Sequence, residues 1–295
     1  MLVKELLAYG ANELKEFASK QLEARILLSH VLRLTHEELL LKFNNPVAPD
    51  LINEFFETIR RRKKFEPVAY ITGNKEFYGL DFFVNKNVLI PRADTELLVN
   101  TVIAEYKNHY QGKEIRILEL GTGSGAIAIS LAVNIPAAKL VATDISDKAL
   151  QVAAKNALRH HVREQIEFIQ SNWYETFSNN NIHGNEYEFD IIVSNPPYIA
   201  SNDIKYMAQE TLLYEPQIAL FAENHGLAGY YHITSKSREF LSKNHQHHSK
   251  LFLEIGFNQR EAVTKILHQH QLNNIICHQD LQQHDRVMVA SLCVT

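Results

Sequence analysis

The chain has 295 residues, of which 45% are hydrophobic and 22% are charged, a composition typical of a soluble globular protein. Its formal net charge of -4 argues against a general nucleic-acid binder, which carries a broad basic field, but it leaves room for a local basic patch. Two cysteines, Cys277 and Cys293, cannot form a disulfide framework, which favours a reducing compartment. The N-terminal residues carry charges throughout, unlike a signal peptide, and no segment approaches the roughly 20 apolar residues of a membrane span. A cytoplasmic location is therefore predicted.

Residues 1–72 are predicted to form a small helical domain. Apolar residues recur at helical spacing in QLEARILLSHVLRL and again in DLINEFFETIRRRKK. The loop NNPVAPD separates these two stretches, and Asp50 is the predicted N-cap of the second. The basic run at residues 60–64 would suit a nucleic-acid contact, but solvated cations at the C-terminus of a helix are the favoured interpretation.

Residues 73–93 are predicted to form a hairpin linker. The hydrophobic period changes toward two in this region, and Gly73 and Gly79 are turn signals. Residues 94–295 then alternate between strand and helix patterns, which predicts a mostly parallel sheet covered on both faces. The last two strand patterns are close neighbours in the chain, so the final strand is expected to be antiparallel. The predicted fold class is therefore α/β, preceded by the small helical domain.

A glycine loop forms the first candidate site. The sequence ILELGTGSGAIAIS contains a buried strand, a loop that runs from Gly121 to Gly125, and the start of a helix. Glycines let the backbone turn sharply and approach a ligand closely. Dinucleotide sites use the pattern G-x-G-x-x-G, whereas this loop is G-x-G-x-G and follows Glu119. A carboxylate at that position would repel a pyrophosphate and attract a cationic ligand.

Two further strand ends extend this site. Asp144 ends the next strand at the distance along the chain where a carboxylate meets ribose hydroxyls, and an aromatic Trp173 follows the third strand in the sequence SNW. The pattern predicts a site for a nucleoside that has a positive centre and no phosphate, such as S-adenosylmethionine. Each piece alone could be a tight turn or a helix cap, but their order along one alternating pattern favours a ligand site.

The sequence SNPPY forms the second candidate site, at the end of a buried strand. Ligands bind at the carboxyl ends of strands in an open parallel sheet. Asn195 offers a side-chain carbonyl there, and Pro196 offers a backbone carbonyl, so the two acceptors match the two N–H donors of a planar NH2 group. Pro197 adds rigidity without a competing donor, and Tyr198 can lie flat against the planar group. The sequence therefore predicts a clamp for a planar NH2 group.

The clamp also suggests how such a nitrogen could be methylated. An amide or aromatic amine nitrogen is a poor nucleophile because its lone pair is delocalised. Hydrogen bonds to both of its hydrogens favour rehybridisation as the methyl group arrives, and alignment of nitrogen, methyl carbon and sulfur supplies most of the remaining rate. No strong base is evident, and none is required if the proton leaves after attack.

Fifteen histidines prompt a search for a metal site. His245, His247 and His248 lie in a polar loop, and His268 and His270 lie near a helix end. No cysteine or carboxylate lies at ligand spacing around them, which favours solvated histidines over metal ligands. No metal is predicted.

Taken together, these motifs resemble those of a known family. The sequences IPRADTELL, LELGTGSGAIAISLA, SNWY, SNPPYI, YEPQIALFA, EIGFNQ and DRVMVA occur in the order seen in the bacterial peptide chain release factor N(5)-glutamine methyltransferases, the HemK/PrmC family. The resemblance covers nearly the whole chain. It implies a helical domain joined by a hairpin to a class I, Rossmann-like S-adenosylmethionine-dependent methyltransferase domain. It also implies methyl transfer to the glutamine of the GGQ motif in release factors one and two, which modifies translation termination.

The resemblance also implies roles for individual residues. The implied cofactor contacts are Gly121, Thr122, Gly123, Ser124, Gly125, Asp144, Trp173 and Asn195, and the implied glutamine contacts are Asn195, Pro196, Pro197 and Tyr198. Asn195 and Pro196 are the predicted catalytic residues. The chain departs from the family at Ala93, where a proline is usual, and at Asn172, where an acid is common, and the second departure affects the expected adenine contact.

The alternative is an adenine-N(6) or guanine-N(2) nucleic-acid methyltransferase, because those enzymes hold an exocyclic NH2 group with a similar clamp. Such an enzyme should carry a target-recognition domain and a basic channel for phosphates. The chain is net negative, and its basic cluster is confined to residues 60–64. A binding-only or scaffold protein would not need the clamp. Protein-glutamine methylation is therefore favoured, with no membrane partner and no nucleic-acid substrate.

Overall fold

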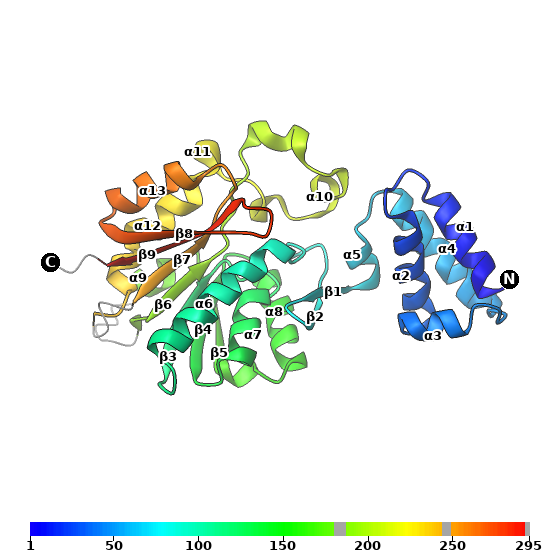
Figure 1. The fold of residues 1–295 in the computed structure, drawn as a ribbon, viewed down its shortest axis with the longest axis horizontal. Helices are drawn as coiled ribbons and strands as arrows, with labels where there is room; N and C mark the ends of the chain where they lie inside the picture. Colours follow the sequence, from blue (N-terminus) through cyan, green and yellow to red (C-terminus); the bar gives the residue numbers. More distant parts are fainter. Residues whose placement is uncertain (180–186, 244–248, 293–295) are drawn as a thin grey trace. The chain divides into compact units, whose positions relative to one another are not determined.

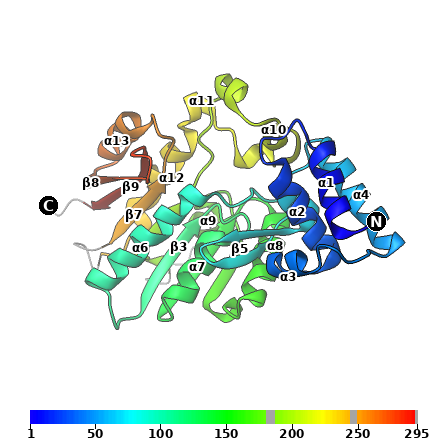
Figure 2. The ribbon, with the colours of Figure 1, turned by 45° about the vertical axis from the view of Figure 1, so that its right-hand side comes forward.

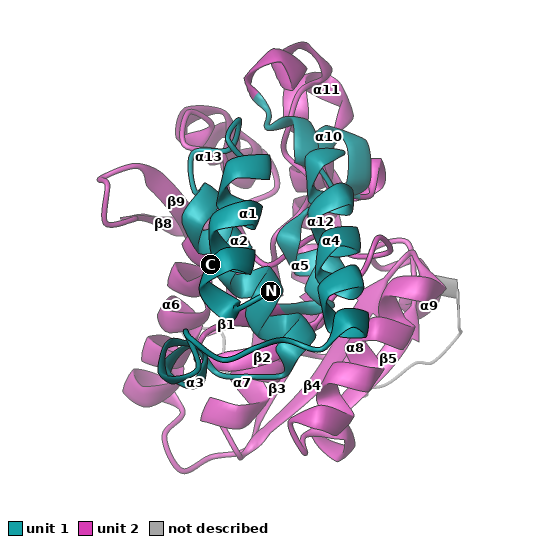
Figure 3. Cartoon of the chain, turned by 90° about the vertical axis from the view of Figure 1, so that its right-hand side faces the viewer, with its two compact units in different colours: residues 1–74, 207–215 teal, residues 75–206, 216–295 magenta. Residues whose placement is uncertain are grey.

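The computed structural model describes residues 1–179, 187–243 and 249–292 (Figure 1). Contacts divide the chain into two compact units, which are residues 1–74 with 207–215, and residues 75–206 with 216–295 (Figure 3). The predicted boundaries at residues 72 and 93 stay predictions. His245, His247, His248 and Cys293, which the sequence singled out, lie outside the described residues.

The first unit is helical. It contains α1 (Val3–Glu13), α2 (Lys20–Leu32), α3 (His36–Leu41), α4 (Pro49–Lys63), α5 (Val68–Thr72) and the later helix α10 (Gln209–Tyr214). Apolar residues at helical spacing meet in one core, which includes Leu6, Leu27, Leu28, Phe55 and Ile59, but Leu22 and Ile26 of the first stretch are exposed. Asp50 lies within the first turn of α4, whose N-cap is Ala48, so the predicted cap is two residues too late.

The basic run at the end of α4 is held by carboxylates. Arg62 is only 4% exposed, its Nε lies 2.7 Å from Glu23 Oε2, and its guanidinium also pairs with Glu210 of α10. Arg61 and Lys63 pair with Glu66 and Glu13. The expectation of solvated cations is therefore wrong for Arg62. This guanidinium takes part in the packing of the unit, because burial of a cation requires opposite charges around it.

A two-stranded hairpin follows the first helices in the chain. It consists of β1 (Asn74–Phe77) and β2 (Leu80–Phe83). The intervening residues Tyr78 and Gly79 both have positive φ, at 53° and 72°. Positive φ at both central residues is the geometry of a tight two-residue turn, so glycine at the second of them avoids backbone strain.

A seven-stranded sheet forms the centre of the second unit (Figures 1 and 2). Its order is β5-β4-β3-β6-β7-β9-β8, and the pairs from β5 to β7 are all parallel, whereas β9 is antiparallel to both β7 and β8. The predicted mostly parallel sheet with an antiparallel last strand is confirmed. The strands are β3 (Ile115–Leu120), β4 (Ala138–Asp144), β5 (Ile166–Gln170), β6 (Ile191–Ser194), β7 (Lys250–Glu254), β8 (Leu272–Gln279) and β9 (Asp285–Leu292).

Helices cover both faces of this sheet. On one face, Leu118 and Leu120 of β3 pack in a core with residues of α9 (Glu175–Asn179), α12 (Ala228–Phe240) and α13 (Arg260–Gln269). Side chains alternate along a strand, so Glu119 points to the other face, where it accepts a hydrogen bond from Ala128 N of α7 (Ala126–Asn134). Helices α6 (Glu96–His109) and α8 (Asp147–Arg159) each pack against α7 on that face.

Short helices complete the second unit. They are η1 (Ala93–Thr95), η2 (Arg163–Gln165), η4 (Ser201–Tyr206), η5 (Gln217–Ala219) and α11 (Glu223–Gly226). Within the residues that the structure describes, every helix is too short or too polar to cross a bilayer.

Candidate active site

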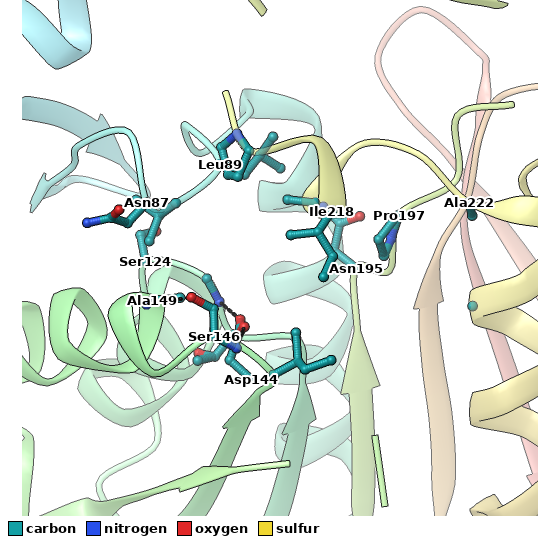
Figure 4. Close-up of a pocket in the computed structure, with 18 of the residues that line it drawn as sticks. Asn87, Leu89, Ser124, Asp144, Ser146, Ala149, Asn195, Pro197, Ile218 and Ala222 are labelled. Atoms are coloured by element: carbon teal, nitrogen blue, oxygen red, sulfur yellow. Dashed lines mark hydrogen bonds between the residues drawn. The ribbon is translucent and has the colours of Figure 1, made fainter. Parts of the chain in front are cut away.

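The carboxyl ends of β5, β4, β3 and β6 border one pocket of about 490 Å³ in the second unit (Figure 4). The chain leaves β3 toward β4 on one side and returns to β6 on the other, so this is the point at which the strand order reverses. Ligands of open α/β sheets bind at such a point. Of the predicted site residues, the pocket is lined by Gly121, Thr122, Gly123, Ser124, Asp144, Trp173, Asn195 and Pro197.

The glycine loop presents its backbone to this pocket. Gly121 and Gly123 have φ values of +76° and +57°, and a Cβ built at either residue would meet no atom within 4 Å. The left-handed backbone explains the need for glycine, while the open space beside it is available to a ligand. Gly125 differs, because its Cβ would lie 2.8 Å from Ile129 and 3.1 Å from Ala153. Gly125 is not among the residues that line the pocket, and its missing side chain allows the start of α7 to pack closely against α8.

Asp144 ties two of these strand ends together. Its Oδ2 accepts from Gly123 N at 2.9 Å, and its Oδ1 accepts from Ser146 N at 2.9 Å. Burial raises the pKa of Asp144, and the hydrogen bonds from Ser146 and Gly123 oppose this effect. The two carboxylate oxygens together offer about four lone-pair sites, so the carboxylate can still accept from a hydroxyl group in the pocket.

Glu119 does not reach the pocket, contrary to the sequence argument that it would face a cationic ligand. It is 1% exposed, and its Oε2 accepts from Thr122 Oγ1 at 2.6 Å and from Ala128 N at 3.1 Å. Burial raises the pKa of Glu119 to about 7. Its carboxyl therefore holds the glycine loop onto the start of α7.

The end of β5 supplies a polar and an aromatic side chain. Trp173 stacks against His232 with an interplanar angle of 14°, and both residues line the pocket. Asn172 also lines it, and its Nδ2 donates to Glu175 Oε1 at 2.8 Å. Because that bond occupies the amide nitrogen, the carbonyl oxygen of Asn172 is left as an acceptor for a donor in the pocket.

The end of β6 carries the predicted clamp. Asn195 Nδ2 donates to Thr95 Oγ1 at 3.2 Å, which leaves the carbonyl oxygen of this pocket-lining residue as the acceptor. Pro196 is buried, and its side chain lies 3.0 Å from a Cβ built at Gly229. Tyr198 lies outside the pocket lining, and its hydroxyl donates to Glu254 Oε1 at 3.4 Å.

Several pocket residues were not predicted from the sequence. Residues 86–95 and 216–223 contribute Leu89, Thr95, Ile218 and Ala222 to the lining, and Figure 4 shows Leu89 and Ile218 across the pocket from Asp144 and Ser146. Thr95 belongs to the motif IPRADTELL, and Ile218 and Ala222 belong to YEPQIALFA, whereas Leu89 directly precedes the first motif. These segments lack the regular period that would place them. Gln259 was also missed, although its Nε2 donates to Tyr198 O at 3.0 Å.

The residues that the structure describes contain no group of three or more His, Cys, Asp or Glu side chains arranged to hold a metal ion. Cys277 is free and half-buried.

Comparison with known proteins agrees with this architecture. Residues 5–73 match the PrmC N-terminal domain, and residues 93–225 match the methyltransferase small domain. Among solved structures, the hMettl16 catalytic domain in complex with MAT2A 3'UTR hairpin 1 has a TM-score of 0.56 and 14% identity, and the similarity covers 83% of this chain and 81% of that chain. The delta-N METTL16 MTase domain has a TM-score of 0.50, with coverage of 81% and 94%. Fold and matched domain thus define an α/β methyltransferase.

Sequence relatives narrow the class to a family. The release factor glutamine methyltransferase of Aliivibrio fischeri is 36% identical over 94% of this chain and 92% of its own length. That of Agrobacterium fabrum is 37% identical over 92% and 90%. The chain belongs to the release factor glutamine methyltransferase family.

The chain is also similar to longer proteins. It is 42% identical to the bifunctional methyltransferase of Rickettsia conorii over 98% of its own length, but it spans only 57% of that relative.

Proposed function

We propose that the protein transfers a methyl group from S-adenosylmethionine to the side-chain amide nitrogen of the glutamine in the GGQ motif of release factors one and two. The observation that carries this proposal is the position of Asn195, which lines the same pocket as the glycine loop and Asp144. Its amide nitrogen donates a hydrogen bond to Thr95, so its carbonyl oxygen remains available as an acceptor. The hydrogen-bond acceptor for the substrate and the pocket for the cofactor are thus adjacent, as methyl transfer to a planar NH2 group requires. The similarity to release factor glutamine methyltransferases supports the choice of a release-factor glutamine.

The pocket fits the proposed cofactor. Its volume of about 490 Å³ lies within the range of small-molecule sites. In this proposal Asp144 accepts from the ribose hydroxyls, the backbone of residues 121–124 lies beside the nucleoside, and Trp173 and Asn172 border the adenine. When bound, S-adenosylmethionine supplies a methyl group activated by its positive sulfur.

The clamp residues hold the substrate amide. Asn195 Oδ1 and the Pro196 carbonyl accept its two N–H groups, Pro197 keeps the turn rigid, and Tyr198 packs against the amide plane. Hydrogen bonds that strengthen as the nitrogen rehybridises lower the barrier, and the shared pocket aligns the nitrogen with the methyl carbon. The new C–N bond forms as the bond between the methyl carbon and the sulfur breaks, which leaves S-adenosylhomocysteine as the product. The amide proton then passes to water.

The helical unit has a proposed role in recognition of the release factor. Its residues 1–74 contain neither the glycine loop nor the clamp. Their removal should leave the methylation of a short glutamine peptide measurable, while greatly reducing the methylation of the intact factor. Equal loss with both substrates would contradict a recognition role. Both protein partners of such a reaction are cytoplasmic in this proposal.

The deciding experiment is transfer of labelled methyl groups from S-adenosylmethionine to purified release factor, followed by peptide mapping. We expect one labelled glutamine, and no labelling after that glutamine is replaced. Nucleic-acid binding falls steeply with salt because bound counterions are released, so DNA and RNA are tested in parallel at physiological salt. Labelled nucleic acid with unlabelled release factor would overturn the proposal in favour of the adenine-type enzyme.

The ion pairs of Arg61, Arg62 and Lys63 also argue against a free basic patch that could bind nucleic acid.

A further inference from the structure

Thr95 stands at the N-terminus of α6 but does not cap it. Threonine at this position usually accepts a hydrogen bond from the first turn of the helix, yet the Thr95 side chain makes no such bond. It is 5% exposed and instead accepts from Asn195 Nδ2 at 3.2 Å. The buried Thr95 hydroxyl therefore interacts with the distant Asn195 amide and not with the backbone of its own helix, which indicates a role other than helix capping.

The direction of this hydrogen bond determines how the Asn195 amide is oriented. A hydroxyl has one proton and can donate it once, whereas its oxygen can also accept. If Thr95 donated to Asn195, the Asn195 carbonyl would turn toward Thr95 and its NH2 group would turn away. Two NH2 groups would then face each other in the clamp. Thr95 must therefore donate its proton elsewhere.

Glu254, at the end of β7, offers an acceptor for that proton. It is 1% exposed, and its Oε2 is buried without a hydrogen-bond partner, so it can take up a proton donor. The Thr95 side chain lowers the pKa of Glu254, as a hydrogen-bond donor would. An ionised carboxylate can only accept, so Thr95 is forced to be the donor. The order of donation is then Asn195 to Thr95 to Glu254.

Other charged and titratable groups also surround Glu254. Tyr198 donates to its Oε1 at 3.4 Å, and Tyr230 of α12 donates to its backbone oxygen at 3.3 Å. Arg286 of β9 favours the ionised form, whereas Asp94 of η1 opposes it, and these two side chains pair with each other at 3.1 Å. Burial is the largest influence and raises the pKa of Glu254 to about 7.

We infer that Thr95 and Glu254 are positioning residues, which keep the carbonyl oxygen of Asn195 turned toward the substrate NH2 group through a directed chain of hydrogen bonds. This inference rests on the proposed function, because it concerns how the clamp accepts the glutamine amide. It gives a function to one residue in each of two motifs, Thr95 in IPRADTELL and Glu254 in EIGFNQ.

Two variants of Thr95 test the inference. Thr95→Val keeps the size of the side chain but removes the hydroxyl, and Thr95→Ser keeps the hydroxyl but removes the methyl group. We expect Thr95→Val to lower kcat roughly 10- to 100-fold, since misplacement of a contacting group costs rate in that range. Thr95→Ser should stay within about threefold of wild type, less than the effect of a typical hydrogen bond. Calorimetric affinity for S-adenosylmethionine should stay close to wild type in both, which also shows that they are folded.

The outcomes separate this inference from the proposed function. Failure of the wild-type protein to label release factor would defeat the proposed function itself. A wild type that labels release factor, with Thr95→Val equally fast, would defeat only the positioning role. Equal loss of kcat in Thr95→Val and Thr95→Ser would also defeat it, because the hydroxyl would then not be the group that matters. Glu254→Gln preserves the shape of the carboxyl and tests the other end of the chain, with a lower kcat expected and an unchanged kcat contradicting the inference.

Discussion

Asp144 Oδ2 accepts a hydrogen bond from Gly123 N at 2.9 Å, which joins the end of β4 to the loop that follows β3. Ser146 N binds the other carboxyl oxygen at 2.9 Å, so the side chain is fixed from both sides. A fixed carboxylate loses little conformational freedom when a ligand binds, which favours affinity. The residue that contacts the ribose in our proposal is thus also the one that shapes the glycine loop.

Asp144→Ala should weaken binding of S-adenosylmethionine at least tenfold. A hydrogen bond to a charged group contributes roughly 1.5 to 3 kcal/mol, and loss of the bond to Gly123 also loosens the loop. Calorimetry measures the change. Asp147→Ala, at an exposed residue outside the pocket lining, is the matched control and should bind normally. An Asp144→Ala protein that is folded and binds with unchanged affinity would remove the ribose contact from our proposal.

Asn195→Ala should damage turnover more than cofactor binding. It removes one acceptor of the reacting NH2 group, and deletion of a comparable oxyanion-hole donor costs roughly 10² to 10³ in kcat. Single-turnover methylation of release factor measures the loss. Asn108→Ala, at an exposed position of α6, is the control with expected wild-type activity. Wild-type turnover by Asn195→Ala would exclude the clamp mechanism.

Much of the fold follows from local sequence patterns. Alternating strands and helices, and apolar strands such as IRILEL that are buried on both faces, predicted the parallel sheet. The position of β9 between β7 and β8 was not predicted, because strand order depends on contacts between distant residues. The association of α10 with the first unit was not predicted from the sequence either. It includes the pairing of Glu210 with Arg62, which are 148 residues apart.

The sequence predicted those parts of the candidate site in which a motif lies at the end of a strand. Asp144 and Asn195 line the pocket as their positions after strands suggested. Glu119 was misjudged because the sequence does not reveal which face of the sheet a strand residue points to, and the helix α7 covers that face. Thr95 could be found only in three dimensions, since its hydrogen bond to Asn195 spans 100 residues.

Asn172→Ala should weaken S-adenosylmethionine binding about fivefold, as expected for the loss of one hydrogen bond worth about 1 kcal/mol. The Asn172 carbonyl is free to accept because the amide nitrogen donates to Glu175 at 2.8 Å. Competition with an analogue that lacks the adenine amino group provides the measurement. Wild type should bind that analogue more weakly, whereas Asn172→Ala should no longer discriminate. Undiminished discrimination by the variant would assign adenine recognition to other groups.

Arg62→Ala should lower the free energy of unfolding of the helical unit by roughly 3 kcal/mol, the lower end of the cost of breaking a buried ion pair. The change leaves Glu23 without its buried cation and removes the contact of the guanidinium with the Phe17 ring, which lies 4.0 Å away. Arg60→Ala on the same helix is the control, because its exposed pair with Glu57 should contribute less than about 0.5 kcal/mol. Urea unfolding followed by circular dichroism compares the two. Similar losses in both variants would contradict a structural role for the buried ion pair.

The rate of methyl transfer should fall as the pH falls through about 7, the value to which burial raises the pKa of Glu254. Below that pH the protonated carboxyl can donate to Thr95, whose hydroxyl is then free to donate to Asn195 and to turn its carbonyl away from the substrate. Measurement of kcat from about pH 6 to about pH 8.5 should reveal this acid limb, and Glu254→Gln should lack it.

Stability provides the control for this pH dependence, because it should change in the opposite direction. Glu119 and Glu254 have ordinary pKa values of 4.5 that are raised to about 7 in the folded protein. Between these values the folded protein binds more protons than the unfolded chain, so these groups lower the free energy of unfolding as the pH rises. Activity lost near pH 6 therefore cannot be assigned to unfolding through these two residues. A wild-type kcat that stays constant from about pH 8.5 to about pH 6, or an acid limb that persists in Glu254→Gln, would show that Glu254 does not direct the clamp.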